Sequence, residues 1–235
     1  MFTEAYKQAF NVLKSKPFRL WGLSLLNIVI CAAAGLLSIG FLPLGMAFAF
    51  VIDCGMAKVY LDGLSGREVN ADQLFEGCKS FGGFLRIAGG MAWQSLWIFL
   101  WCLIPIVGPV FAVIKYYEYR FVPYILMTRP EVSATQALRL SMQLTKGKKG
   151  QMFLADFLLG IVCFAAVLVL TLFAFIPIIG LLFGMTEFLL ILVLAAFSPV
   201  FIGLYGAAFY RMPQVIQQPQ QPQPPTQMPA PGENA

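Results

Sequence analysis

Residues 157–186 read FLLGIVCFAAVLVLTLFAFIPIIGLLFGMT, thirty positions without a charged side chain between Asp156 and Glu187. Two more uncharged runs cover residues 20–52 and 87–114. A helix that crosses a membrane needs about 20 predominantly apolar residues, and each run is longer than that. The sequence therefore predicts an all-α integral membrane protein that crosses the bilayer several times.

The overall composition points to the same class of protein. The 235-residue chain is 59% hydrophobic and only 11% charged, whereas soluble domains have about 25% charged residues. It contains no histidine, which excludes imidazole catalysis and histidine-ligated metals. Five cysteines, at positions 31, 54, 78, 102 and 163, form no CxxC pair, so no disulfide or zinc site is predicted. We expect no catalytic residue, no metal and no cofactor.

Three similar proline–glycine turns interrupt the apolar runs. Each turn lies between two membrane-length segments, where proline ends one helix and glycine allows the chain to reverse. The turns are Pro43 to Gly45, Pro105 to Gly108 and Pro177 to Gly180. They predict three helical hairpins, and hence six spans, near 19–40, 43–62, 84–104, 107–128, 150–176 and 184–210.

A short amphipathic segment precedes each hairpin. Residues 3–15, 70–81 and 133–145 place apolar side chains at helical spacing and end near basic residues, as suits a helix lying on a membrane surface. The second and third segments begin with a capping-box pattern, at Asn70 with Gln73 and at Ser133 with Gln136. The chain is therefore predicted to be a pseudo-threefold repeat with units 1–67, 68–131 and 132–211.

The basic residues predict how the protein is oriented. The three hairpin turns contain no lysine or arginine, so the positive-inside rule places both termini in the cytoplasm. This rule also accounts for the net charge of +5 without nucleic-acid binding. Residues 212–235 are rich in proline and glutamine and are predicted to be a disordered cytoplasmic tail.

Charged residues inside the predicted spans are the candidates for a polar site, because charge in the bilayer is costly. Asp53, Lys115 and Glu187 each lie ten residues after the proline of their hairpin, so a threefold packing would bring them to similar depth. Glu118 and Arg120 follow Lys115 in a tyrosine-rich stretch, where Lys115 and Glu118 can pair within the helix. A structural ion pair, a transport or ligand site, and an interfacial position are the alternatives.

The basic cluster of Lys146, Lys148 and Lys149 is a second candidate. It lacks the spacing of a phosphate-binding P-loop, and we interpret it as a contact for anionic lipid headgroups. Asp156 lies near this cluster in the sequence and is expected to pair with it at the membrane interface.

The second half of the chain resembles a known family. The residues that carry the resemblance are Tyr116-Tyr117-Glu118-Tyr119, Val122-Pro123-Tyr124-Ile125-Leu126, Pro130, Ala137-Leu138, Ser141, Lys146-Gly147, Phe153 and Phe209-Tyr210. They are similar to a bacterial multi-pass membrane family classed as domain of unknown function 975, itself similar to the membrane domain of some glycerophosphodiester phosphodiesterases. The chain departs from the family at Thr128-Arg129-Pro130, where an acidic residue commonly precedes the proline. The resemblance implies a six-span protein of the bacterial inner membrane and transfers no catalytic residue.

Two functions are consistent with these features. The first is a non-enzymatic scaffold or accessory protein that acts through lipid and protein contacts, favoured by the three amphipathic segments and the tail. The second is a small transporter or lipid-handling channel that uses the intramembrane charges. Membrane lipids are the expected partners, with a membrane protein or a second copy of the chain as further alternatives and no nucleic acid.

Overall fold

The computed structural model describes residues 2–15, 17–37, 42–174 and 180–217, and all regular structure in these ranges is helical. Four helices are long and apolar enough to cross a membrane. They are α2 (Pro17–Leu37), α3 (Leu42–Leu64), α8 (Lys149–Ala174) and α9 (Gly180–Gln217). These helices confirm the all-α class and are compatible with insertion into a membrane.

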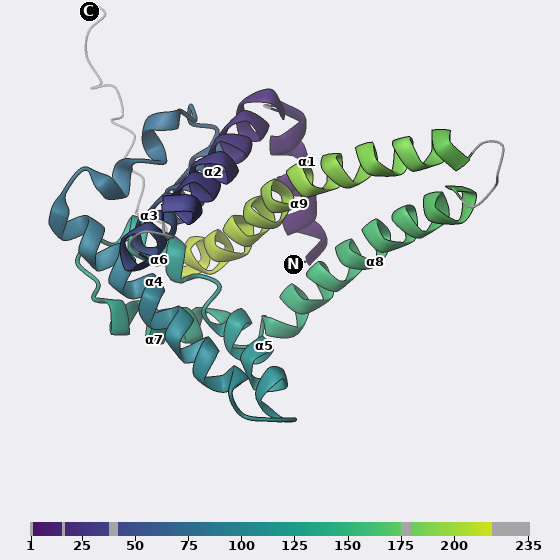
Figure 1. Ribbon diagram of the computed structural model, residues 1–235. Coiled ribbons are helices and arrows are strands. Elements are labelled where there is room, and N and C mark those ends of the chain that lie inside the picture. The colour runs from purple at the N-terminus through teal and green to yellow at the C-terminus, as the bar shows by residue number, and fades with distance from the viewer. Residues whose placement is uncertain (1, 16, 38–41, 175–179, 218–235) are drawn as a thin grey trace, which may run out of the picture.

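The four long helices form two hairpins that meet along α9. Helix α2 packs on α3, and α8 packs on α9. The C-terminal half of α9 lies in the centre of the molecule against α1 (Phe2–Ser15), α2 and α3, while its N-terminal half extends outward beside α8 (Figure 1). Almost none of the apolar stretch of α8 is buried, so this outer hairpin is exposed on both faces.

The middle of the chain differs from the predicted second hairpin. Helix α4 (Phe81–Cys102) packs on α5 (Gly108–Glu118), but α5 ends where the predicted span 107–128 continues. A separate short helix, α6 (Val122–Thr128), follows with Pro123 in its first turn, the helix position at which a missing N–H costs least. Residues 107–128 are therefore two helices joined by a break.

Two of the three predicted surface helices are present. The first is α1, and the third is α7 (Ala134–Thr145). The capping box before α7 is confirmed: the Gln136 N–H donates to Ser133 Oγ at 3.4 Å, and the Ser133 N–H donates to Gln136 Oε1 at 3.0 Å.

The prediction of a surface helix at residues 70–81 is wrong. This segment contains only two single 3₁₀ turns, η1 (Ala71–Gln73) and η2 (Glu76–Cys78). The Asn70 side chain makes no capping hydrogen bond, and the side-chain NH₂ group of Gln73 donates to Asp62 Oδ2 and to the Glu68 carbonyl, both at 3.2 Å. Tertiary contacts to α3 thus replace the local capping box.

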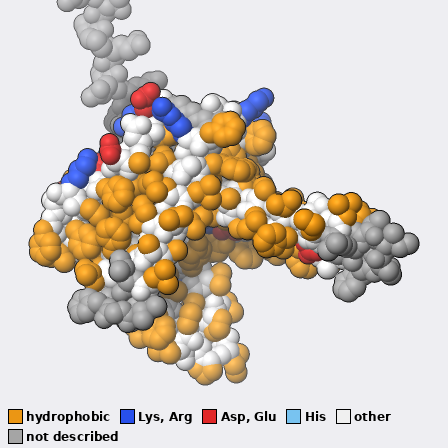
Figure 2. All heavy atoms as spheres, turned by 45° about the horizontal axis from the view of Figure 1, so that its top comes forward, with side chains coloured by type: hydrophobic (Ala, Val, Ile, Leu, Met, Phe, Trp, Pro, Cys, Tyr) orange, Lys and Arg blue, Asp and Glu red, His pale blue; other side chains and the backbone are white. Residues whose placement is uncertain are grey.

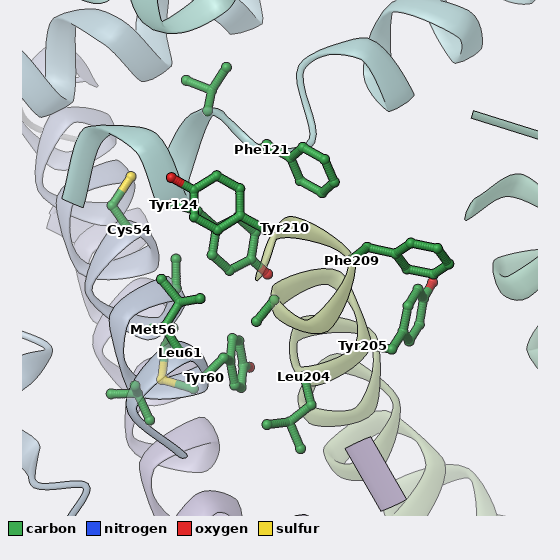
Figure 3. Packing of buried hydrophobic residues seen from close by; sticks show 14 of the residues in the cluster. Cys54, Met56, Tyr60, Leu61, Phe121, Tyr124, Leu204, Tyr205, Phe209 and Tyr210 are labelled. Carbon is green, nitrogen blue, oxygen red and sulfur yellow. The ribbon is translucent and has the colours of Figure 1, made fainter. Parts of the chain in front are cut away.

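The hydrophobic core lies where α3, α6 and the C-terminal half of α9 meet (Figure 3). Tyr124 of α6 stacks on Tyr210 of α9 with ring centroids 5.5 Å apart, and Tyr205 and Phe209 are fully buried beside them. Outside this core, apolar side chains cover most of the visible surface, and charged side chains gather along one edge of it (Figure 2). A surface of this kind suits a lipid environment.

The remaining sequence predictions concern the chain ends and turns. Helix α9 continues to Gln217, past the predicted start of the tail at residue 212. The rest of the tail lies outside the described residues, as does most of the Pro177 turn.

Candidate functional site

A hydroxyl group of α7 stabilises the break between α5 and α6. Ser141 Oγ donates to the Glu118 carbonyl at 2.6 Å and accepts from the Phe121 N–H at 3.2 Å. Ser141 is fully buried, so these two bonds satisfy backbone groups that a continuous helix would otherwise pair. The break turns residues 119–121 out of helical register and directs Arg120 toward the last two helices.

Arg120 joins three parts of the chain. Its guanidinium contacts the Asp156 carboxylate of α8 through Nη1 at 2.5 Å and through Nη2 at 3.3 Å. Nη2 also donates to the Tyr205 hydroxyl of α9 at 2.8 Å, and the Tyr117 hydroxyl donates to Asp156 at 2.8 Å. Only 8% of the Arg120 side chain is exposed. The positive charge of Arg120 is therefore balanced locally by Asp156.

Tyr6 of α1 contacts both α8 and Tyr205 of α9 beside this ion pair. Its hydroxyl donates to the Ala155 carbonyl at 2.7 Å, and its ring stacks on Tyr205 with centroids 5.5 Å apart. Burial, with a smaller contribution from the negative charge of Asp156, raises the pKa of Tyr6 above its usual value. The hydroxyl thus remains a hydrogen-bond donor and ties the surface helix to α8.

A polar pocket of about 400 Å³ lies beside Arg120, between α2, α3, α5, α6 and α9. Its size falls within the range of ordinary ligand pockets, about 300–1,000 Å³. The polar side chains that line it are Ser24, Asn27, Asp53, Tyr60, Tyr116, Arg120, Tyr124 and Ser198. We refer to it as the Asp53 pocket.

Asp53 is the charged group most open to this pocket. It lies midway along the apolar helix α3, and its side chain is exposed although its neighbours Ile52 and Cys54 are fully buried. The Asn27 side chain hydrogen-bonds its carboxylate, but no basic side chain among the described residues forms an ion pair with it. Because Asp156 already balances Arg120, no charge among the lining residues is left to balance Asp53 when it is ionised.

The predicted pair of Lys115 and Glu118 is confirmed. Lys115 Nζ lies 2.7 Å from Glu118 Oε2, and Lys149 Nζ lies 2.5 Å from Glu118 Oε1. Lys149, proposed from the sequence as a lipid contact, is thus partly engaged by Glu118. Lys146 is exposed, and Lys148 is half-buried, which lowers its pKa below the usual value.

The contacts of the described residues do not join Asp53, Lys115 and Glu187, which the threefold hypothesis would bring to similar depth. Asp53 opens into the pocket, Lys115 pairs with Glu118, and Glu187 accepts a hydrogen bond from Thr171 of α8 at 2.7 Å. Asp53 and Arg120 instead line the same pocket.

Sequence reasoning missed the roles of Asp156 and Ser141. Asp156 was expected to pair with Lys148 and Lys149, but it contacts Arg120. Ser141 lies in the amphipathic segment 133–145, and a serine on the apolar side of such a helix is a signal for a buried hydrogen bond. Within the described residues, no group of three or more cysteine, aspartate or glutamate side chains is placed to hold a metal ion.

Comparison of the chain with models of known protein families, with curated proteins and with solved structures found no match. The resemblance to the family of unknown function, best over about residues 70–211, therefore stays a prediction.

Proposed function

We propose that this chain is an integral protein of a bacterial cytoplasmic membrane that binds a small organic cation in the Asp53 pocket. The cation is an ammonium group, carried by a small solute or by a lipid headgroup. This is the transport or lipid-handling role considered from the sequence, now attached to a defined pocket. The single observation that carries it is the Asp53 carboxylate, which opens into a polar pocket without an ion-pair partner among the described residues.

The charge balance of the pocket favours a positively charged ligand. An uncompensated charge within a membrane-length helix is costly and marks a functional position by default. Arg120 cannot supply the missing charge without giving up Asp156, to which it makes two contacts. A positively charged ligand would neutralise Asp53 and remove this cost, whereas an anion would add to it.

The tyrosines of the pocket provide the remaining contacts. Tyr60 donates to the Pro199 carbonyl at 3.3 Å, and Tyr124 donates to the Gly203 carbonyl at 3.0 Å. Because their hydrogens are already used, both hydroxyl oxygens can only accept further hydrogen bonds. The aromatic rings of Tyr60, Tyr116 and Tyr124 also attract cations through their faces. Acceptors and aromatic rings around one carboxylate are typical of ammonium recognition.

Choline is a suitable probe for this function. We expect millimolar choline to raise the melting temperature of the purified full-length protein in detergent, relative to sodium at equal ionic strength, because a ligand that binds only the folded state stabilises it. The variant Asp53→Asn should lose this shift. Glu187→Gln, which also neutralises an acid in a membrane-length helix but lies outside the pocket, should keep it. Equal shifts in Asp53→Asn and the parent protein would contradict the proposal.

The membrane topology is part of the same proposal. We propose that α4 and the broken segment of α5 and α6 enter the bilayer as a third hairpin, which gives six spans with both termini in the cytoplasm. Helix α4 has 22 residues, about 33 Å at 1.5 Å per residue, and this length supports a crossing. Helix α5 has 11 residues, about 17 Å, so the return crossing also needs α6.

A scaffold role remains a second candidate because of the outer hairpin. The apolar stretch of α8 is almost entirely unburied, and a partner protein could cover it as well as lipid. A photo-crosslinking amino acid at Val162, which is 66% exposed, separates the two. One discrete crosslinked protein band would support the scaffold, whereas adducts to lipid alone would favour a lipid-facing hairpin.

A further inference from the structure

A second pocket lies beside a different face of α5 from the Asp53 pocket. It has a volume of about 340 Å³ and is formed by α4, α5 and α7. Lys115 and Tyr119 line this pocket, whereas Tyr116 and Arg120 line the Asp53 pocket. The end of α5 and the break that follows it therefore contribute side chains to two separate pockets. We refer to the second one as the tryptophan groove.

One wall of the groove is a row of tryptophans. Trp93, Trp97 and Trp101 lie four residues apart along α4, and the rings of Trp93 and Trp97 contact edge to face with centroids 6.0 Å apart. The row extends about 12 Å along the helix axis, at 1.5 Å per residue. An aromatic belt at a membrane interface would lie at one depth, so a row along the membrane normal indicates a surface for an elongated apolar chain.

The other end of the groove is basic. Lys115 and Arg139 line it, and no acidic side chain is among its lining residues. The nearby Glu118 is shared between Lys115 and Lys149, so the two lysines retain a net positive charge. Arg139 is exposed and has no ion pair among the described residues.

The two ends of the groove match the two ends of a lipid. Helix α7, which carries Arg139, is a short amphipathic helix suited to the membrane surface, and the tryptophan row runs from there toward the turn at Pro105. We infer that the tryptophan groove binds one anionic phospholipid of the surrounding membrane, with its phosphate at Arg139 and Lys115 and an acyl chain along the tryptophans. This inference rests on the proposed topology, in which α4 crosses the bilayer, but not on cation binding, because no residue lines both pockets.

Tryptophan fluorescence gives a direct test, since three of the four tryptophans of the chain lie in the groove. The full-length protein in detergent is titrated with phosphatidylglycerol or phosphatidylcholine, each with brominated acyl chains that quench nearby tryptophan. We expect phosphatidylglycerol to quench at about fivefold lower concentration, the preference that one basic residue near a headgroup typically supplies.

Three variants locate the site. Arg139→Gln should remove the preference for phosphatidylglycerol. Lys146→Gln, which removes an exposed basic residue outside the groove lining, should keep it. Thr135→Phe narrows the groove without a change in charge and should weaken quenching by both lipids. Equal quenching by the two lipids in the parent protein, or equal losses in Arg139→Gln and Lys146→Gln, would overturn the inference and indicate general attraction to the basic surface.

Discussion

Arg120 and Asp156, 36 residues apart in the sequence, form a two-point ion pair that joins the α5–α6 break to the start of α8. Tyr117 and Tyr205 bond to the same two side chains, so the pair is the centre of a network rather than an isolated contact. Because Asp156 pairs with Arg120, Asp53 is the acid of the pocket that has no ion-pair partner among the described residues.

The first prediction concerns the stability of this ion pair. Asp156→Ala leaves the nearly buried Arg120 without its counter-charge, and the loss of one partner of a buried pair typically costs about 3 kcal/mol. We expect a clear fall in melting temperature in detergent. The matched control is Glu4→Ala, which removes the acid of the exposed pair with Lys7 and should cost well under about 1 kcal/mol. Similar losses in both variants would show that the network is not structural.

The second prediction concerns the hydroxyl at the helix break. Ser141→Ala leaves the Phe121 N–H without its partner and leaves the Glu118 carbonyl with a longer contact to Thr145 Oγ1, at 3.4 Å. An unsatisfied buried backbone group costs about 1–3 kcal/mol. Ser65→Ala removes a hydroxyl that bonds only within its own helix end, to the Leu61 carbonyl, and should be nearly neutral. Thermal unfolding of the two variants side by side is the measurement.

A third prediction separates two glycines of the long helices. A Cβ atom at Gly55 would lie well inside van der Waals contact with the backbone of Leu74, whereas a Cβ atom at Gly160 would meet nothing within 4 Å. Gly55→Ala should therefore destabilise the protein, because backbone cannot move aside as a side chain can. Gly160→Ala should be neutral or slightly stabilising, since alanine favours helix over glycine by roughly 1 kcal/mol. The reverse order would contradict the packing of the 3₁₀ turns on α3.

The fourth prediction tests the six-span topology at the turn between α4 and α5. Ile106 is 92% exposed and has a φ of 68°, so a cysteine there is accessible. In a background without the five natural cysteines, Ile106→Cys should react with a membrane-impermeant maleimide in right-side-out spheroplasts. Lys146→Cys, on the predicted cytoplasmic side, should react only after permeabilisation. Labelling of Ile106→Cys only after lysis would exclude a full crossing by α4 and α5.

The elements that were predictable from the sequence rest on local signals. The uncharged run at 157–186 predicted the hairpin of α8 and α9, and the Ser133–Gln136 capping box predicted the start of α7. Both depend on residues within one or two turns of each other, which periodicity and capping rules describe well. The pair of Lys115 and Glu118 belongs to the same class, because it lies within one turn of a helix.

The elements that were not predictable depend on distant contacts. The capping pattern at Asn70 starts no α-helix, and the Gln73 side chain bonds to Asp62 on α3. The span 107–128 is broken where Ser141 on α7 satisfies its open backbone groups. The equal spacing of Asp53, Lys115 and Glu187 from a proline does not fix which way each helix faces after packing. The Asp53 pocket depends on five helices that are far apart in the sequence.

The length of α8 has a mechanical consequence. Its uncharged part, residues 157–174, extends about 27 Å, close to the hydrocarbon thickness of a bilayer, about 30 Å. A helix of this length needs little tilt in a bilayer of ordinary thickness, and its tilt changes in a thinner or thicker one. The first two turns of α8 are joined through Asp156 to Arg120, at the edge of the Asp53 pocket. A change in the tilt of α8 would therefore act on that ion pair, which gives the lipid composition a route to the pocket without occupying it.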